Sequence, residues 1–216
     1  MSVAMNRVLR GLGWLFIAIG VLVLLYLAYS LLYTNRAASQ AQDDLADEWG
    51  LELPAGGSGL PSEGEDGQAP PPDPGSAVAT LQFRRPGQSE PLVRAEPLYV
   101  VEGVSVLDLQ RGPGHYPDTA LPGGKGNFAV AGHRTTYGAP FFNLDQLRPD
   151  DEVVVTARDK KQYVYRVREQ RIVGPGDSWV VGEDPLERGK RLLTLTTCHP
   201  RFSNTQRMII FAELVT

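Results

Sequence analysis

The chain has 216 residues, with 21 Lys and Arg against 25 Asp and Glu, and a formal net charge of -4 at pH 7. This length allows one ordinary domain with additional segments, and the slightly acidic balance argues against nucleic-acid binding through a global basic field. The single cysteine excludes an intramolecular disulfide framework and a Cys-rich zinc site.

The first feature along the chain is an apolar run. Residues 11–33 carry no charge, and 19 of these 23 residues are apolar. A helix of this length spans about 34 Å, enough to cross a hydrocarbon core of about 30 Å. A cleaved signal peptide is the alternative, but its apolar core is shorter, about 7–15 residues. Arg7 and Arg10 precede the run, so the positive-inside rule predicts that residues 1–10 are cytoplasmic and that everything after Tyr33 lies outside.

The next segment, residues 34–76, is interpreted as a juxtamembrane piece followed by a linker. Residues 50–76 hold six Pro and seven Gly and no Lys or Arg. Such a composition cannot bury enough apolar surface to offset the entropy of ordering it. We therefore expect an extended acidic spacer, preceded by a short juxtamembrane helix over residues 41–50.

Residues 77–216 form the predicted folded unit, in which short β-rich runs alternate with turn signals. The expected strands cover residues 77–83, 97–101, 128–131, 152–156, 162–173, 192–197 and 208–215. Gly/Pro-rich stretches separate several of them, and residues 105–110 and 140–147 can each form a helical turn or two. Many short strands with frequent turns indicate a β-sandwich or a β-barrel.

Cys198 is the residue best placed for chemistry. A free cysteine is often only a small buried hydrophobe, but an unpaired thiol outside the cytoplasm is notable, and this one lies at the end of a predicted strand. At pH 7 only a few per cent of an ordinary thiol is ionised, so attack on a carbonyl needs a neighbouring base. His133 follows a strand end and is the preferred partner, whereas His199 points to the opposite strand face and His115 lies in a Gly/Pro turn.

A cation or donor is also needed for the oxyanion that forms on attack. Arg201 and Arg207 both follow Cys198, and a returning strand can bring Arg207 beside the thiol. Residues 123–126 (GGKG) lack the spacing of a phosphate-binding loop and are interpreted as a turn. No cluster has a convincing metal-ligand spacing, so we expect neither a metal nor a cofactor.

Three stretches make the pattern specific. Residues 194–198 (TLTTC) resemble the TLxTC signature of the sortase family of cysteine transpeptidases, with Gly132-His133 and Arg207 matching the other two catalytic positions. The His-to-Cys interval is 65 residues and the Cys-to-Arg interval is nine. Residues 111–117 (RGPGHYP), 131–142 (AGHRTTYGAPFF) and 194–200 (TLTTCHP) look like the actinobacterial class E subgroup. Residues 80–94 lack the Ile-Pro-x-Ile-like segment with which members of this family usually begin.

The resemblance implies an eight-stranded β-barrel with a few short helices, and it implies roles for the matched residues. The Cys198 thiolate attacks the Thr carbonyl of a C-terminal sorting signal on a secreted protein. His133 acts as general acid and base, and Arg207 holds the substrate and stabilises the oxyanion, with Thr197 contributing. An amine of a peptidoglycan precursor then resolves the thioester. Class E relatives are associated with LAxTG rather than LPxTG signals. Tyr116 and Tyr137 are expected to shape the pocket for the second residue of the signal.

Other functions stay open at this point. A pilin-polymerising sortase that uses a Lys amine resembles this chain, but such enzymes often carry a lid and a C-terminal membrane helix, and neither is evident. A cell-wall L,D-transpeptidase is also a thiol enzyme, but its SHGC-type context is absent. A non-catalytic barrel that binds wall peptides is the alternative from a different class. The joint presence of His133, Cys198 and Arg207 argues against it.

Overall fold

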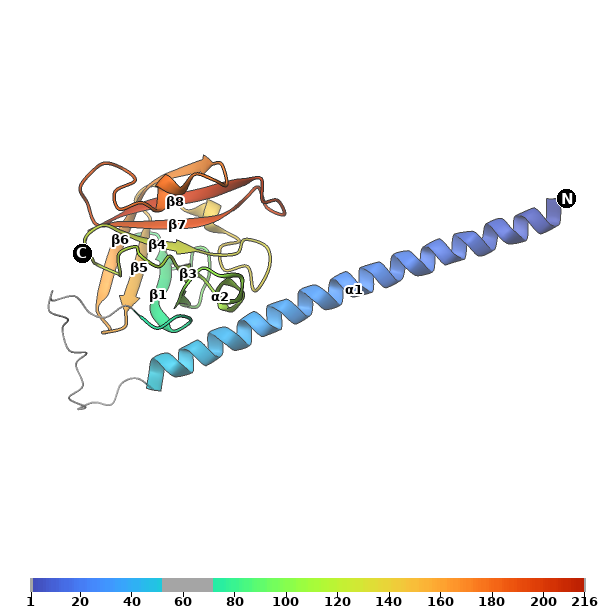
Figure 1. Cartoon of the computed structure of the whole chain (residues 1–216), viewed down its shortest axis with the longest axis horizontal. Coiled ribbons are helices and arrows are strands. Elements are labelled where there is room, and N and C mark those ends of the chain that lie inside the picture. The colour runs from blue at the N-terminus through green and yellow to red at the C-terminus, as the bar shows by residue number, and fades with distance from the viewer. Residues whose placement is uncertain (1, 52–71, 216) are drawn as a thin grey trace.

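A computed structural model describes residues 2–51 and 72–215 and divides them into a long helix and a closed eight-stranded barrel (Figure 1). The helix is α1 (Ser2–Leu51). The strands are β1 (Ala77–Arg84), β2 (Leu98–Glu102), β3 (Gly114–His115), β4 (Asn127–Ala131), β5 (Glu152–Ala157), β6 (Gln162–Val173), β7 (Leu192–His199) and β8 (Gln206–Leu214). The short helices are α2 (Val106–Arg111), η1 (Leu144–Gln146) and η2 (Ser178–Val181).

The strands close in the order β1-β2-β3-β4-β7-β8-β6-β5, with β5 returning to β1. The pairs β2–β3 and β4–β7 are parallel and the other pairs are antiparallel. Closure leaves no open sheet edge, which removes the aggregation hazard of an unpaired strand. The predicted eight-stranded barrel with a few short helices is therefore confirmed.

The core follows from the two-residue period of the strands. Along β8, Met208, Ile210 and Ala212 point into the barrel core, while Ile209 and Phe211 lie on the other face. These outer residues are nevertheless buried, because Val180 of η2 packs against them. A continuous apolar run, buried on both faces, is what this arrangement requires of a strand.

The structure adds two elements that the sequence patterns did not predict. β3 is only two residues long and lies in the Gly/Pro stretch that we interpreted as a turn. η2 follows the turn at residues 174–177. Both are too short to show a periodic apolar pattern. The expected strands all form, and most of their ends shift by one or two residues.

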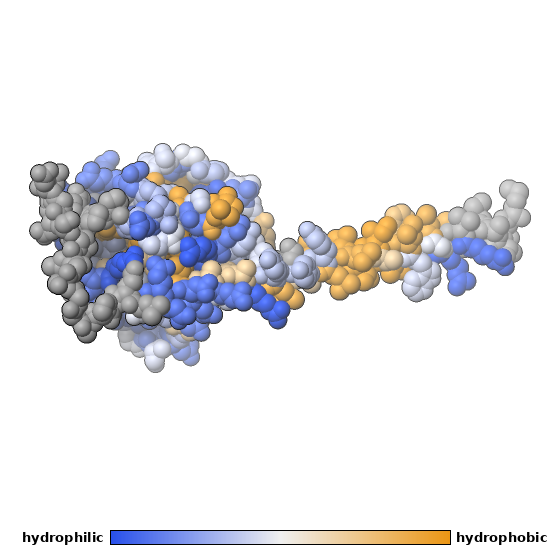
Figure 2. Space-filling view, turned by 60° about the horizontal axis from the view of Figure 1, so that its bottom comes forward, coloured by the Kyte–Doolittle hydropathy of each residue, from blue (hydrophilic) through white to orange (hydrophobic). Residues whose placement is uncertain are grey.

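Helix α1 is longer than the apolar run. It extends without interruption to Leu51, so the short helix expected over residues 41–50 is its continuation. The apolar side chains at residues 9–29 and 32–33 are exposed, as Figure 2 shows, and α1 is long and apolar enough to cross a membrane by length and composition. Residues after 34 instead pack on the barrel.

One face of this second part of α1 is buried. Ala38, Leu45 and Trp49 lie at helical spacing and become buried, and Leu45 and Trp49 form a cluster with Ala77 and Val101. The predicted linker falls mostly on residues 52–71, which lie outside the described residues. Its last part is attached to the barrel: the Gly75 amide donates to the Glu102 carbonyl at 2.8 Å.

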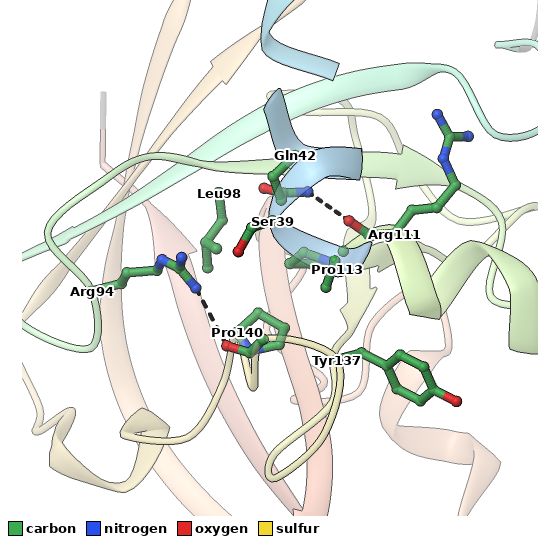
Figure 3. Close-up of a pocket in the computed structure, with 11 residues that line it drawn as sticks. Ser39, Gln42, Arg94, Leu98, Arg111, Pro113, Tyr137 and Pro140 are labelled. Carbon is green, nitrogen blue, oxygen red and sulfur yellow. Dashed lines mark hydrogen bonds between the residues drawn. The ribbon is translucent and has the colours of Figure 1, made fainter. Parts of the chain in front are cut away.

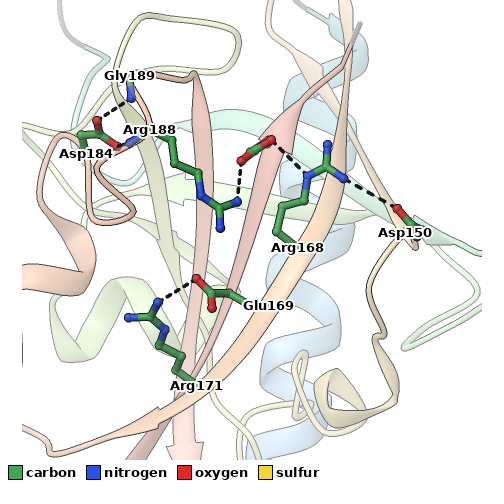
Figure 4. Close-up of polar contacts among 8 residues, drawn as sticks. Asp150, Arg168, Glu169, Arg171, Asp184, Arg188 and Gly189 are labelled. Atoms are coloured by element: carbon green, nitrogen blue, oxygen red, sulfur yellow. Dashed lines mark hydrogen bonds and ion pairs between the residues drawn. The ribbon is translucent and has the colours of Figure 1, made fainter.

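A polar network covers the outer face near β6 and β8. Glu213 accepts hydrogen bonds from Arg188 at 2.8 Å and from Arg168 at 3.1 Å. Arg168 also reaches toward Asp150, and Arg171 pairs with Glu169 nearby (Figure 4). The hydrogen bond from Arg188, followed by that from Arg168, holds the pKa of Glu213 below its usual value.

Candidate active site

Cys198 lies at the end of β7, partly exposed, and faces Arg207 across the antiparallel β7–β8 pair. Directly opposed residues on adjacent strands have neighbouring Cβ atoms and project to the same face. After Cys198 the chain therefore turns and returns beside β7 as β8, as expected from the nine-residue interval. The Arg207 guanidinium donates to the backbone carbonyls of Asn204 at 2.8 Å and Gln206 at 2.9 Å.

His133 reaches the same end of the barrel from the other side of β7. β4 runs parallel to β7, with Ala131 level with Thr196. The pairing continues beyond β4, because the Gly132 amide donates to the Thr196 carbonyl at 3.0 Å. His133 follows Gly132, and Cys198 follows Thr197 on β7, so both residues lie just beyond the last paired residues of β4 and β7. The structure thus brings Cys198 and Arg207 onto the adjacent strands β7 and β8, and His133 into the segment that follows β4, at one edge of the barrel.

Gly132 is required at its position by close packing. A Cβ atom placed on it would lie 2.5 Å from the ring of Phe141, which is fully buried. Phe141 also donates its backbone amide to the His133 carbonyl at 3.1 Å. These contacts hold the backbone on both sides of His133 and therefore fix the point from which its imidazole projects.

The His133 imidazole lies against the ring of Tyr137, with 5.0 Å between ring centroids. Burial lowers the pKa of His133 below its ordinary value. The neutral imidazole is therefore favoured near neutral pH, and this form can accept a proton. A neutral imidazole that can accept a proton is suited to act as a general base.

The two other histidines are engaged elsewhere. His199 follows Cys198 but its Nδ1 atom lies 3.1 Å from a guanidinium nitrogen of Arg134. His115 belongs to β3, is almost fully buried, and its Nδ1 atom lies 2.6 Å from a carboxylate oxygen of Glu102. His115 is thus a satisfied histidine, but in a strand rather than in a turn. In the part of the chain that the structure describes, no group of three His, Cys, Asp or Glu residues is arranged to hold a metal ion.

Arg134 is a site residue that the sequence patterns did not single out. Its side chain is only 3% exposed, and it donates to the Cys198 carbonyl at 3.3 Å. Asp145 lies 3.4 Å away and also pairs with Arg201. Burial lowers the pKa of Arg134, and the Asp145 carboxylate opposes that effect. A buried cation therefore lies directly behind the backbone of Cys198.

The remaining predicted residues surround this centre. The Tyr116 hydroxyl lies 3.1 Å from the Thr196 hydroxyl, and Gln110 donates to the Tyr137 hydroxyl at 3.3 Å. Thr197 is buried, and its hydroxyl donates to the Gly132 carbonyl at 2.7 Å. That proton is engaged with the backbone next to His133. The geometry therefore places Thr197 as a link between β7 and the His133 segment.

Comparison with known proteins is consistent with this arrangement. A family model described as Sortase domain matches residues 93–215. Sortase SrtE1 of Streptomyces coelicolor is 36% identical over 95% of this chain, which spans 57% of that protein. Sortase SrtE2 of the same organism is 33% identical, and the match covers 94% of this chain and 81% of that protein.

Solved structures give the same result. Sortase E from Streptomyces avermitilis is 36% identical with a TM-score of 0.56, over 67% of this chain and 91% of that one. The SrtF sortase from Corynebacterium diphtheriae is 31% identical with a TM-score of 0.61, over 74% of this chain and 92% of that one. The chain therefore belongs to the sortase family of cysteine transpeptidases and is of the class E type.

Proposed function

We propose that this protein is a membrane-anchored transpeptidase that cleaves a C-terminal sorting signal between Thr and Gly and transfers the released acyl group to an amine of a cell-wall precursor. The observation that supports it most directly is that Cys198 pairs with Arg207 across β7 and β8, while His133 follows the end of β4, the strand on the other side of β7. A nucleophile flanked by a base and a cation is what thiol-mediated acyl transfer requires.

The reaction has two balanced halves. His133 takes the proton of the Cys198 thiol as the sulfur attacks the Thr carbonyl, and it gives that proton to the departing Gly amine as the Thr–Gly bond breaks. His133 then removes a proton from the incoming amine, which attacks the thioester and releases the Cys198 thiolate. Arg207 donates to the oxygen that becomes negative in each tetrahedral intermediate and holds the substrate backbone.

Tyr116 and Tyr137 are proposed to select the second residue of the signal, with LAxTG-like signals preferred to LPxTG. Tyr137 packs on the His133 ring, and Tyr116 is fixed through Thr196 two residues before Cys198. Aromatic walls so close to the nucleophile leave room for a small side chain. Replacing either tyrosine with Ala is expected to lower the ratio of LAxTG to LPxTG turnover.

The apolar part of α1 is proposed to span the cell membrane once. Residues 11–33 are uncharged, and Arg7 and Arg10 precede them. The positive-inside rule then places the N-terminus in the cytoplasm and the barrel outside. In this orientation the substrates of the enzyme are secreted proteins that present their C-terminal signal at the outer surface of the membrane.

The test uses the full chain in lipid nanodiscs, LAxTG and LPxTG peptides, and a glycine or lysine amine. Mass spectrometry is expected to find a thioacyl adduct on Cys198 and an amine-linked product. Cys198→Ala and His133→Ala abolish the product, while His199→Ala keeps substantial rate because its ring faces Arg134. Absence of any adduct with every peptide refutes the enzyme, and faster transfer to the lysine amine favours a pilin-polymerising role.

A further inference from the structure

Helix α1 contacts the barrel at three levels. The Asn35 side chain accepts a hydrogen bond from the Gly138 amide at 3.0 Å. About two turns further, Gln42 bonds both backbone groups of Tyr99 and the carbonyl of Arg111, as the close-up in Figure 3 shows for Arg111. Near the end of α1, the Trp49 carbonyl accepts from the Lys160 ammonium, which lies 4.1 Å from the Trp49 ring centroid.

These three levels run from one end of the barrel to the other. Strands β4 and β7 end, and β8 begins, at the edge that carries Cys198. We call this edge, with the loops 132–142 and 200–205, the catalytic rim. Strand β1 begins, and the β5–β6 turn lies, at the opposite edge. Asn35 therefore touches the catalytic rim through Gly138, while Trp49 touches the far edge through Lys160.

The end of the apolar run lies almost level with this rim. Trp14 near one end, and Tyr29 and Tyr33 near the other, are exposed on α1. Such aromatic residues mark the two membrane–water interfaces, and 19 residues of helix separate Trp14 from Tyr33, about 28 Å. Asn35 lies two residues beyond Tyr33, about 3 Å along the helix axis.

The helix offers no hinge between its two parts. Residues 21–49 contain neither Gly nor Pro, and sharp kinks in helices almost always need one of these or an inserted group. In Figure 1 the β7–β8 loop points to the same side as the part of α1 that runs toward the N-terminus. A bilayer around residues 11–33 therefore lies on the side of the catalytic rim.

The rim itself exposes an aromatic side chain on that side. Phe202, in the β7–β8 loop, is 84% exposed, and Arg201 precedes it. Arg201 lies over the ring of Phe142, with 4.4 Å from the guanidinium carbon to the ring centroid. An exposed aromatic ring beside an arginine is typical of segments that lie in the headgroup layer of a membrane.

We propose that the catalytic rim docks on the bilayer surface, with Phe202 in the headgroup layer, so that Cys198 works at the membrane rather than at a distance from it. This inference rests on the proposed membrane span of α1. The part of α1 that packs on the barrel fixes the distance of the barrel from the membrane. A substrate protein or an acceptor amine that is held in the same bilayer then reaches Cys198 without leaving the interface.

The test measures depth with a fluorophore on single-cysteine chains. In a Cys198→Ala background, Phe202→Cys labels the rim and Asp159→Cys, in the exposed β5–β6 turn, labels the far edge. Full-length protein is reconstituted in phosphatidylcholine nanodiscs that carry a nitroxide on the headgroup. Quenching at position 202 is expected to be severalfold stronger than at position 159. Equal quenching, or stronger quenching at 159, overturns the proposal.

A second variant tests the height directly. Seven polar helix-forming residues inserted between Thr34 and Asn35 lift the barrel by about 10 Å and nearly preserve the helix face. Quenching at position 202 should fall severalfold, and the same insertion with Cys198 intact should slow turnover of a vesicle-tethered signal peptide but not of a soluble one. Unchanged quenching refutes the docking. Loss of membrane association would instead refute the proposed anchor, and the Cys198 adduct tests the enzyme separately.

Discussion

Replacing Thr197 with Val removes a single buried hydroxyl and keeps the shape of the side chain. That hydroxyl donates to the Gly132 carbonyl at 2.7 Å, between β7 and the residue before His133. Thr197 is also expected, by family resemblance, to assist the oxyanion. The substitution separates the two roles, because a link between strands affects stability and an oxyanion donor affects the rate alone.

The size of the effect follows from the burial of the bond. Loss of a buried hydrogen bond that leaves a carbonyl unpaired costs about 1–3 kcal/mol. For a folded unit of this size, about 2 kcal/mol lowers the unfolding temperature by roughly 4–8 °C. Release of Gly132 also frees the start of the His133 segment, and a displacement of about 1 Å at a catalytic group can lower the rate about a hundredfold.

The assay combines thermal unfolding with kcat for peptide transfer in Thr197→Val, Thr197→Ser and Thr194→Val. The Ser variant keeps the hydroxyl and should recover most of the loss. Thr194 is the matched control, because it lies on the same strand as Thr197 but further from Cys198. Its buried hydroxyl donates to the Asn127 side chain of β4 at 2.8 Å. Thr194→Val should lower the unfolding temperature and spare kcat. A Thr197→Val variant with normal unfolding temperature but greatly reduced kcat refutes the linking role.

Three further predictions concern the site and the barrel. Because burial lowers the pKa of His133 below 6.5, the unfolded chain binds more protons and stability falls as the pH decreases from 6.5 toward the folded-state pKa; His133→Gln should flatten that part of the curve in urea unfolding, and an unchanged slope contradicts it. Glu213→Gln should cost about 1 kcal/mol at pH 7 and weaken the loss of stability below pH 4.5, because Arg188 and Arg168 lower the pKa of this carboxyl. Gly132→Ala should cost about 1–3 kcal/mol by overpacking, and adding Phe141→Leu should restore part of it in thermal unfolding; no recovery would mean that the Phe141 ring is not the obstacle.

Local patterns predicted the strands well because the strands carry their own signal, whereas the choice of a barrel over a sandwich came from the family resemblance. Residues 192–197 and 208–215 are β-branched and apolar, and the turn between them makes an antiparallel return the simplest path. That return places Arg207 opposite Cys198. The catalytic candidates could therefore be predicted from spacing together with family resemblance. β3 could not, since two residues define no period.

Contacts between distant segments were beyond these patterns. Ala38, Leu45 and Trp49 share a helix face, but the residues that cover it are far along the chain. Leu45 and Trp49 pack on Ala77, Val101 and Tyr99, and the Gln42–Tyr99 contact spans 57 residues. In the sequence, Arg134 is likewise only one of several polar residues that follow His133. Its contact with the Cys198 carbonyl spans 64 residues and depends on closure of the barrel.

The packing of α1 also determines how a soluble enzyme should be prepared. A truncation that starts at residue 77 keeps every barrel strand but removes Leu45 and Trp49 from Val101 and Tyr99. The uncovered apolar surface favours self-association, and the Gly138 amide loses its Asn35 partner. A truncation that starts at residue 34 retains both contacts and discards only the apolar run and the ten residues before it. Low solubility of the shorter enzyme would then reflect the position of the cut, not the quality of the fold.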